Sequence, residues 1–197
     1  MVAVALRCET GRGRPYATGL RADARRLMTL VGLAACELSI VIADDGFVHA
    51  LNRTFRGKDR PTDVLSFSQL EQAHEVRVEE ARPGRRRALV GWRAQAGPLV
   101  PAAGTALGDV VISVDTARRQ ARRLGVASAA RMRTLLVHGL LHLLGYDHER
   151  SPADARRMFA RERELAAALK RRTKPAPSAR GDSRPRKRSK APTGSQI

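Results

Sequence analysis

The sequence predicts an α+β fold in which about five helices pack with four short strands. Two observations favour this fold. Short apolar runs alternate along the chain with segments of helical periodicity, and one late segment, between Ser128 and Gly145, carries leucine around most of its circumference. A helix that is apolar on most faces belongs at the centre of a fold, so we expect the other elements to surround it.

The four predicted strands are short apolar runs bounded by polar or turn-forming residues. The second is an alternating-to-apolar run rich in Ile and Val. Together the predicted strands cover residues 2–6, 37–43, 64–67 and 107–114.

The first two helices follow the first two strands. Glycines and Pro15 interrupt regular structure after the first strand, and a helical pattern of leucines begins at Thr18. After the second strand, Asp44 or Asp45 is a good N-cap for a short helix, because an aspartate side chain accepts hydrogen bonds from the first free backbone N–H groups.

Three more helices occupy the second half of the chain. Asp115 is expected to cap a helix that ends near Gly125. The strongly apolar helix begins at Ser128, and Gly145 ends it in a left-handed conformation. An amphipathic helix over residues 154–171 comes last.

Two segments fit poorly into a compact domain. Residues 69–106 form a long insertion that contains glycine, proline and three consecutive arginines. Residues 171–197 consist mainly of Pro, Ser, Arg and Lys, and we expect a basic disordered tail there. The sequence therefore predicts one domain over residues 1–170, interrupted by the insertion and followed by the tail.

The chain is strongly basic, with 37 Lys and Arg residues against 19 acidic ones and a formal net charge of +18. Half of this charge lies in residues 170–197. A chain this basic attracts polyanions, and RNA or DNA is the default partner. The abundance of arginine is also typical of a GC-rich genome, which is the alternative explanation. Aromatic residues make up only 4%, which argues against a module that stacks bases on an aromatic sheet.

The two cysteines, Cys8 and Cys36, have neither close spacing nor a metal-binding pattern. We expect them to be free, buried thiols of a cytoplasmic protein. The first residues lack the pattern of a signal peptide, and no stretch is apolar enough to span a membrane. These patterns predict a cytoplasmic protein without a membrane partner.

Three of the five histidines fall close together: His138, His142 and His148. The first two are four residues apart on the apolar helix, so their rings project from one face. Gly145 reverses the chain and allows the third ring to return to the same point. Three imidazoles with one open coordination position form the ligand set of a catalytic zinc site. A pair of structural histidines is the alternative, but bare imidazoles are poor core residues.

The spacing of these histidines matches a long metalloprotease motif with one difference. Such enzymes carry Glu directly after the first histidine as the general base. Here that residue is Gly139. The helix supplies ligands without a carboxylate, so peptide hydrolysis by the usual mechanism is not expected.

Three stretches resemble the YbeY family of metal-dependent bacterial endoribonucleases, also called rRNA maturation factors. They are LNRTFRGKDRPTDVLSF at 51–67, LGDVVIS at 107–113, and the histidine segment at 138–148. The resemblance implies an α+β fold with a small mixed four-stranded sheet and a central helix that carries two metal ligands.

The resemblance also implies a function and its components. His138, His142 and His148 would bind one Zn²⁺ per chain. The implied activity is single-strand-specific RNA cleavage in rRNA maturation, notably at the 16S rRNA 3′ end, and in ribosome quality control. RNA, chiefly ribosomal RNA, and the small ribosomal subunit are the implied partners.

Arg56 matches an arginine that the family uses in RNA processing, so we expect it to be catalytic. Arg56, Lys58 and Arg60 also offer cations to phosphates, and arginine grips a phosphate through two parallel hydrogen bonds. A solvated turn is the alternative for this segment. Phe55 stands where the family commonly has Tyr.

Two other functions stay open. One is a metal-dependent hydrolase of another substrate, such as a peptide, which the missing Glu and the positive charge disfavour. The other is a ribosome-assembly factor whose metal is not catalytic, and the lack of an evident general base keeps this hypothesis open.

Overall fold

The computed structural model describes residues 3–70 and 101–170. The predicted α+β fold is confirmed: these residues form a mixed four-stranded sheet and five α-helices. Most of the predicted insertion and all of the predicted tail lie outside the described residues. The division of the chain at residue 170 therefore stays a prediction.

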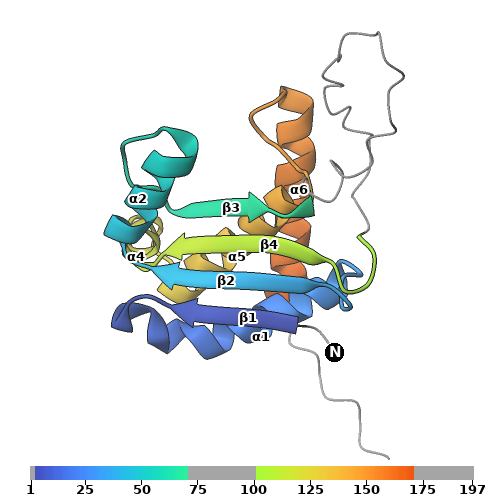
Figure 1. Ribbon diagram of the computed structural model, residues 1–197, viewed down its shortest axis with the longest axis horizontal. Coiled ribbons are helices and arrows are strands. Elements are labelled where there is room, and N and C mark those ends of the chain that lie inside the picture. The colour runs from blue at the N-terminus through green and yellow to red at the C-terminus, as the bar shows by residue number, and fades with distance from the viewer. Residues whose placement is uncertain (1–2, 71–100, 171–197) are drawn as a thin grey trace, which may run out of the picture.

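The sheet has the strand order β1-β2-β4-β3. The strands β1 (Ala3–Cys8), β2 (Glu37–Ala43) and β4 (Ala106–Ser113) are parallel, and β3 (Val64–Ser68) runs antiparallel to β4 at the edge. Figure 1 shows the arrowheads of the three parallel strands at one end of the sheet and that of β3 at the other. The elements that follow the three parallel strands therefore all begin at the same end of the sheet.

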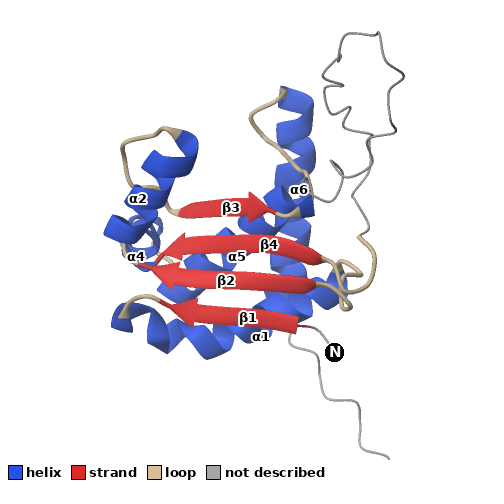
Figure 2. Cartoon of the chain, viewed as in Figure 1, coloured by secondary structure: helices blue, strands red, loops and turns tan. Residues whose placement is uncertain are grey.

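Helices pack around this sheet. They are α1 (Arg14–Leu30), α2 (Asp45–Arg56), α4 (Val114–Leu124), α5 (Ser128–Leu143) and α6 (Pro152–Lys170), with a short 3₁₀ helix, η1 (Gly11–Gly13), before α1. The helix α5 contacts β3, β4, α1, α4 and α6, and Figure 2 shows it behind the strands. No helix among the described residues is long and apolar enough to cross a membrane.

The central position predicted for α5 follows from its composition. Eight of its side chains or glycine positions are buried, among them Leu136, Val137 and Leu140. They pack with residues of β2, β4, α1 and α6 in one core. A Cβ atom added at Gly139 would lie only 2.6 Å from Val110 Cγ1, so this turn of α5 approaches the sheet too closely for any other residue.

Two predicted helix starts were wrong. The helix α1 begins at Arg14, before the predicted Thr18, because Pro15 lies in its first turn, where proline loses no hydrogen bond. The helix α4 is capped by Ser113 rather than Asp115: the Ser113 hydroxyl accepts from Thr116 N–H at 3.1 Å. Of the two caps predicted for α2, Asp44 or Asp45, the structure selects Asp44, whose carboxylate accepts from Phe47 N–H at 2.9 Å.

Candidate metal centre

The last turns of α5 carry the first two histidines of the predicted metal site. His138 and His142 are one turn apart, and their Nε2 atoms lie 3.1 Å from each other. Because the helix is packed by the core on its other faces, the two rings are held at the one face that opens toward a cleft. The i, i+4 spacing thus places two ligand atoms side by side before any ion is bound.

A Schellman motif ends α5 and brings the third histidine back. Gly145 adopts a φ of 85°, its N–H donates to His142 O at 3.0 Å, and Tyr146 N–H donates to Leu141 O at 3.0 Å. The chain reverses, and the ring centroid of His148 lies 5.2 Å from those of both His138 and His142. The left-handed conformation predicted for Gly145 is therefore the feature that closes the cluster.

The three rings fit a metal ion. One nitrogen of each lies within 4.8 Å of the others. Nδ1 of His148 is buried and has no hydrogen-bond partner among the described residues, which is costly for a polar atom unless a ligand compensates it. Three neutral imidazoles are a ligand set for zinc and related divalent ions. Metal binding at these residues thus has support from the geometry as well as from the spacing.

Burial keeps His142 in the form that binds metal. Burial, with the nearby His138 and His148, lowers the pKa of His142 to about 4. At neutral pH its ring is therefore uncharged, and its lone pair is free to coordinate a cation.

Glu162 of α6 is a site residue that the sequence prediction missed. Its Oε2 atom lies 3.2 Å from Nδ1 of His138, and the carboxylate side chain is only 18% exposed. A carboxylate at this position fixes the ring with Nδ1 as donor and leaves Nε2 as the ligand atom. Glu162 lies on the apolar face of α6, between the buried Met158 and Leu165, and an acid at such a position was the available signal.

The histidines line a cleft of about 720 Å³ that also receives the end of α2 and the loop after it. Arg56, the last residue of α2, lines this cleft, and its guanidinium lies 4.0 Å from Glu149 Oε2. Lys58 and Arg60 line it as well. The structure thus brings Arg56 and the three histidines into one cleft, while the catalytic role of Arg56 stays a prediction.

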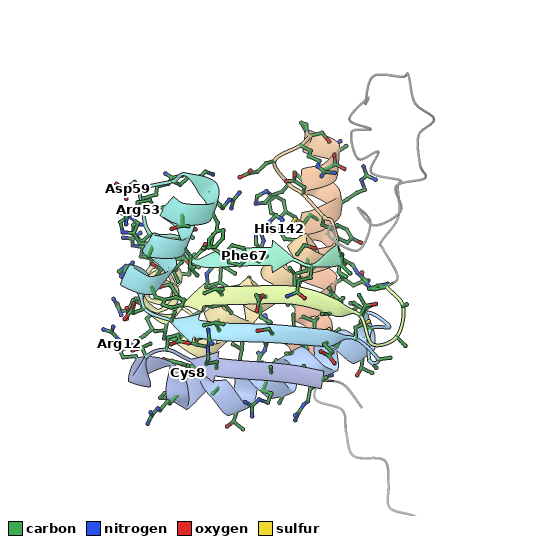
Figure 3. The ribbon with its side chains drawn as sticks, viewed as in Figure 1. Cys8, Arg12, Arg53, Asp59, Phe67 and His142 are labelled. Atoms are coloured by element: carbon green, nitrogen blue, oxygen red, sulfur yellow. The ribbon has the colours of Figure 1, made fainter. Side chains whose placement is uncertain are left out.

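Aromatic rings gather around the same cleft. Phe55 and Phe67 meet edge to face at 5.3 Å, and both line it together with Tyr146. Phe159 packs against His148 with ring centroids 5.6 Å apart. Figure 3 shows Phe67 on β3 and His142 above it. Phe55 is 64% exposed, so its ring offers an open apolar surface beside the histidines.

The structure explains why no Glu follows His138. The Cα of Gly139 faces the sheet, where Val110 and Ser66 leave no room for a side chain, and Ser66 donates to Gly139 O at 3.1 Å. A carboxylate at this position would enter the core rather than the cleft. The residues present therefore do not reproduce the metalloprotease arrangement.

Of the other two histidines, the structure describes only His49, which lies outside the cluster. His49 is on α2, and its Nε2 lies 2.7 Å from Asp59 Oδ1, so it ties the helix to the loop that carries Lys58 and Arg60. His74 lies outside the described residues. Cys8 and Cys36 are free, as predicted, but Cys8 is only partly buried.

Comparison with known proteins gives the relatives of this chain. The Endoribonuclease YbeY of Anaeromyxobacter sp. strain Fw109-5 is 44% identical over 167 residues, which cover 85% of this chain and 72% of that protein. The Endoribonuclease YbeY of Geobacter metallireducens is 42% identical over 153 residues, which cover 77% of this chain and 85% of that protein. The solution structure of TM1509 from Thermotoga maritima aligns with a TM-score of 0.52 and 20% identity over 84% of this chain and 88% of that one, a likeness of fold alone.

The sequence profile of the family described as Endoribonuclease YbeY matches residues 20–170. This range includes the histidine cluster, Glu162 and Arg56, and therefore the whole cleft described above. The chain belongs to the Endoribonuclease YbeY family.

Proposed function

We propose that this protein is a metal-dependent endoribonuclease that cleaves single-stranded regions of ribosomal RNA. The observation that carries the proposal is one cleft that combines three convergent imidazoles with Arg56 in a member of this family. The net charge of +18 supports an RNA substrate, because phosphates are drawn to such a surface.

The bound ion and the basic residues of the cleft have separate tasks in this proposal. Zinc, one ion per chain, is the ion that three imidazoles suit best, and when bound it supplies a Lewis acid that also lowers the pKa of water. Arg56 faces the scissile phosphate and stabilises the negative charge that develops on its oxygens. Lys58 and Arg60 hold flanking phosphates in place.

Phe55 supports the preference for single strands. Its ring is exposed at the edge of the cleft, where an unpaired base can stack on it, whereas bases within a duplex are stacked on each other. Glu162 holds the His138 ring in one orientation throughout.

Membership of the family supports the biological setting that belongs to this proposal. We propose maturation of the 16S rRNA 3′ end and ribosome quality control, with the small ribosomal subunit as the partner and the cytoplasm as the location. A peptide hydrolase is disfavoured by the packing at Gly139. An assembly factor with a non-catalytic metal is the second candidate, because no carboxylate on α5 faces the cleft.

Cleavage of an rRNA fragment with a single-stranded 3′ extension tests the proposal. The full-length protein should cut the extension, lose activity in chelator and regain it when zinc is added back. His142→Ala should be inactive under every condition. Tight binding of the fragment without metal-dependent cleavage would contradict the enzyme and favour the assembly factor.

A further inference from the structure

A second hollow, lined by charged side chains, lies at the end of the sheet where the parallel strands β1, β2 and β4 terminate. It has a volume of about 440 Å³ and is lined by Arg12, Asp45, Asp115, Arg118, Arg119 and Arg122. We call these six residues the arginine pocket. Because β1, β2 and β4 are parallel, the elements that follow them meet at this edge: η1 gives Arg12, α2 gives Asp45 and α4 gives the others. Ligands of α/β folds commonly bind at such an edge.

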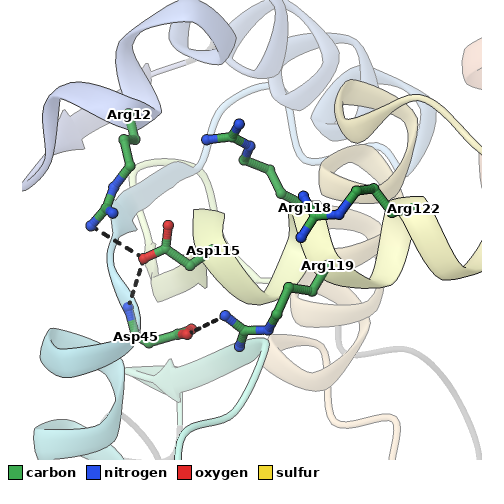
Figure 4. Close-up of a pocket in the computed structure, with 6 residues that line it drawn as sticks. All are labelled: Arg12, Asp45, Asp115, Arg118, Arg119 and Arg122. Carbon is green, nitrogen blue, oxygen red and sulfur yellow. Dashed lines mark hydrogen bonds and ion pairs between the residues drawn. The ribbon is translucent and has the colours of Figure 1, made fainter.

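Two of the four arginines are held by the two aspartates. Arg119 Nη1 lies 2.6 Å from Asp45 Oδ2, and Arg12 Nη2 lies 3.3 Å from Asp115 Oδ2. Asp45 also accepts from Ser113 Oγ and Thr116 Oγ1. Figure 4 shows these pairs joined across the hollow. The carboxylates are therefore engaged with protein donors and fix two guanidinium groups in position.

The other two arginines, Arg118 and Arg122, have no such partner in the described part of the chain. The side chains of Arg118 and Arg122 make no hydrogen bond or ion pair with a described residue, and both residues are exposed. Even when Asp44, 3.8 Å from Arg12, is included, the four arginines outnumber the carboxylates by one. The uncompensated charge lies on Arg118 and Arg122, one turn apart on α4 and facing the same hollow (Figure 4).

The arginine pocket shares one helix with the cleft that is lined by His138, His142, His148 and Arg56, which we call the metal cleft. Asp45 begins α2 at the pocket, and Arg56 ends it at the cleft. At 1.5 Å per residue, the two ends of α2 are roughly 16 Å apart. A single RNA strand of several nucleotides spans such a distance, so one strand can touch both sites.

We propose that the arginine pocket binds a backbone phosphate of the RNA strand whose scissile phosphate lies in the metal cleft. Arg118 and Arg122 bind the phosphate, and Arg12 and Arg119, held by their aspartates, shape the hollow around it. The proposal rests on the RNA substrate of the proposed function. It adds a docking site that contributes affinity and salt dependence and takes no part in the cleavage step.

Equilibrium binding of the full-length chain to fluorescent RNA tests this site. The variant Arg118→Gln/Arg122→Gln is compared with the control Arg25→Gln/Arg163→Gln, which removes the same charge from exposed positions on α1 and α6. Each protein is titrated with a single-stranded RNA of about twelve nucleotides and with a dinucleotide, in chelator so that no cleavage interferes, over a range of salt concentrations.

The pocket variant should bind the longer RNA about 5- to 20-fold more weakly at low salt. The slope of the logarithm of its binding constant against the logarithm of the salt concentration should fall in magnitude by roughly 0.7 for each phosphate that the variant no longer binds. Its affinity for the dinucleotide should not change. If the control variant loses the same RNA affinity, the effect comes from net charge alone and the proposal is overturned. The proposal is also overturned if the pocket variant loses the same affinity for the dinucleotide as for the longer RNA.

Cleavage assays with zinc separate this proposal from the proposed function. The pocket variant should show a raised KM for the longer RNA and an unchanged kcat. If the wild-type protein does not cleave RNA but the binding pattern above is found, the docking site in the arginine pocket is supported and the proposed endoribonuclease function is contradicted. A lowered kcat with unchanged KM and affinity would overturn the docking role.

Discussion

The metal cleft and the arginine pocket are built in opposite ways. In the cleft, the two proposed ligands His138 and His142 lie on α5, a largely buried helix, and the core fixes their positions. In the pocket, charged side chains come from three elements, and ion pairs with two aspartates fix only two of the four arginines. Packing gives the precise geometry that coordination and catalysis require, whereas long charged side chains suit the recognition of a flexible phosphate backbone. Substitutions in the cleft should therefore change metal content or rate, and substitutions in the pocket should change affinity.

The largest effect is expected at His142. His142→Ala removes one of three imidazoles, and the two that remain cannot retain an ion at stoichiometric level. Elemental analysis of the purified protein should find little metal in this variant. His49→Ala, a substitution on α2 outside the cluster, should keep full occupancy. Full metal content in His142→Ala would remove the basis of the metal centre.

The second-largest effect is expected at Arg56, where a substitution should change the cleavage rate much more than the affinity for RNA. Arg56→Ala should retain metal and most RNA binding while cleavage slows about 100-fold, or roughly 3 kcal/mol of transition-state stabilisation. Arg56→Lys should recover only part of the rate, because an ammonium lacks the two-pronged geometry. Single-turnover cleavage at saturating protein measures this, with Arg53→Ala as the control on the same helix outside the cleft. A wild-type rate for Arg56→Ala would make Arg56 a docking residue.

Substitution of Glu162 should have a smaller effect, limited to the affinity for the metal ion. Glu162→Gln keeps the shape of the side chain but removes the charge that orients His138, so metal affinity should fall about 10-fold. Competition with a chromophoric chelator measures this affinity. Glu164→Gln changes an exposed carboxylate on the same helix and should leave the affinity unchanged. Equal affinities for both variants would show that the Glu162 carboxylate does not support the site.

The arginine pocket makes a modest contribution to stability through Asp45. Burial would raise the pKa of Asp45, but hydrogen bonds from Arg119, Ser113 and Thr116 outweigh it and lower the pKa to about 2, from an ordinary 3.8. As pH falls, the unfolded chain takes up this proton first. The stabilisation is therefore complete above the ordinary value and is lost as the pH falls toward 2.

Asp45→Asn should lower the free energy of unfolding by about 1–2 kcal/mol at pH 7, and the difference from wild type should shrink below pH 4. Urea denaturation at several pH values measures it. Asp59→Asn, at a more exposed ion pair, should change the free energy of unfolding by no more than about 0.5 kcal/mol. A difference between Asp45→Asn and wild type that does not depend on pH would contradict this origin of the stability.

Features encoded in contiguous residues could be predicted from the sequence. The apolar run of β2 ends at Ala43 and is followed by two aspartates; the strand was predicted correctly, and the cap was narrowed to Asp44 or Asp45, of which the structure uses Asp44. The histidine cluster was predictable because helix periodicity and a glycine-ended cap are local rules. Ser113 and Asp115 are both good caps, and the choice depends on where β4 stops pairing, which local sequence does not determine.

Features that join distant segments could not be predicted in this way. Glu162 meets His138 only because α6 packs on α5, although the two residues are 24 positions apart. The arginine pocket brings Arg12 to α4 because β4 inserts beside β2 in the sheet. Pairings of this kind depend on the strand order, and no periodicity in the sequence encodes it.

The packing of α5 also sets the order in which the site is assembled. The residues that surround this helix belong to the core, so its last turns are in place whether or not an ion is present. Small zinc modules, by contrast, fold only when they are loaded. If the three histidines bind an ion as proposed, folding comes first and loading second, and the ion can leave and return without global unfolding. The residence time of such an ion would then depend mainly on His148, the one proposed ligand carried by the turn beyond the helix.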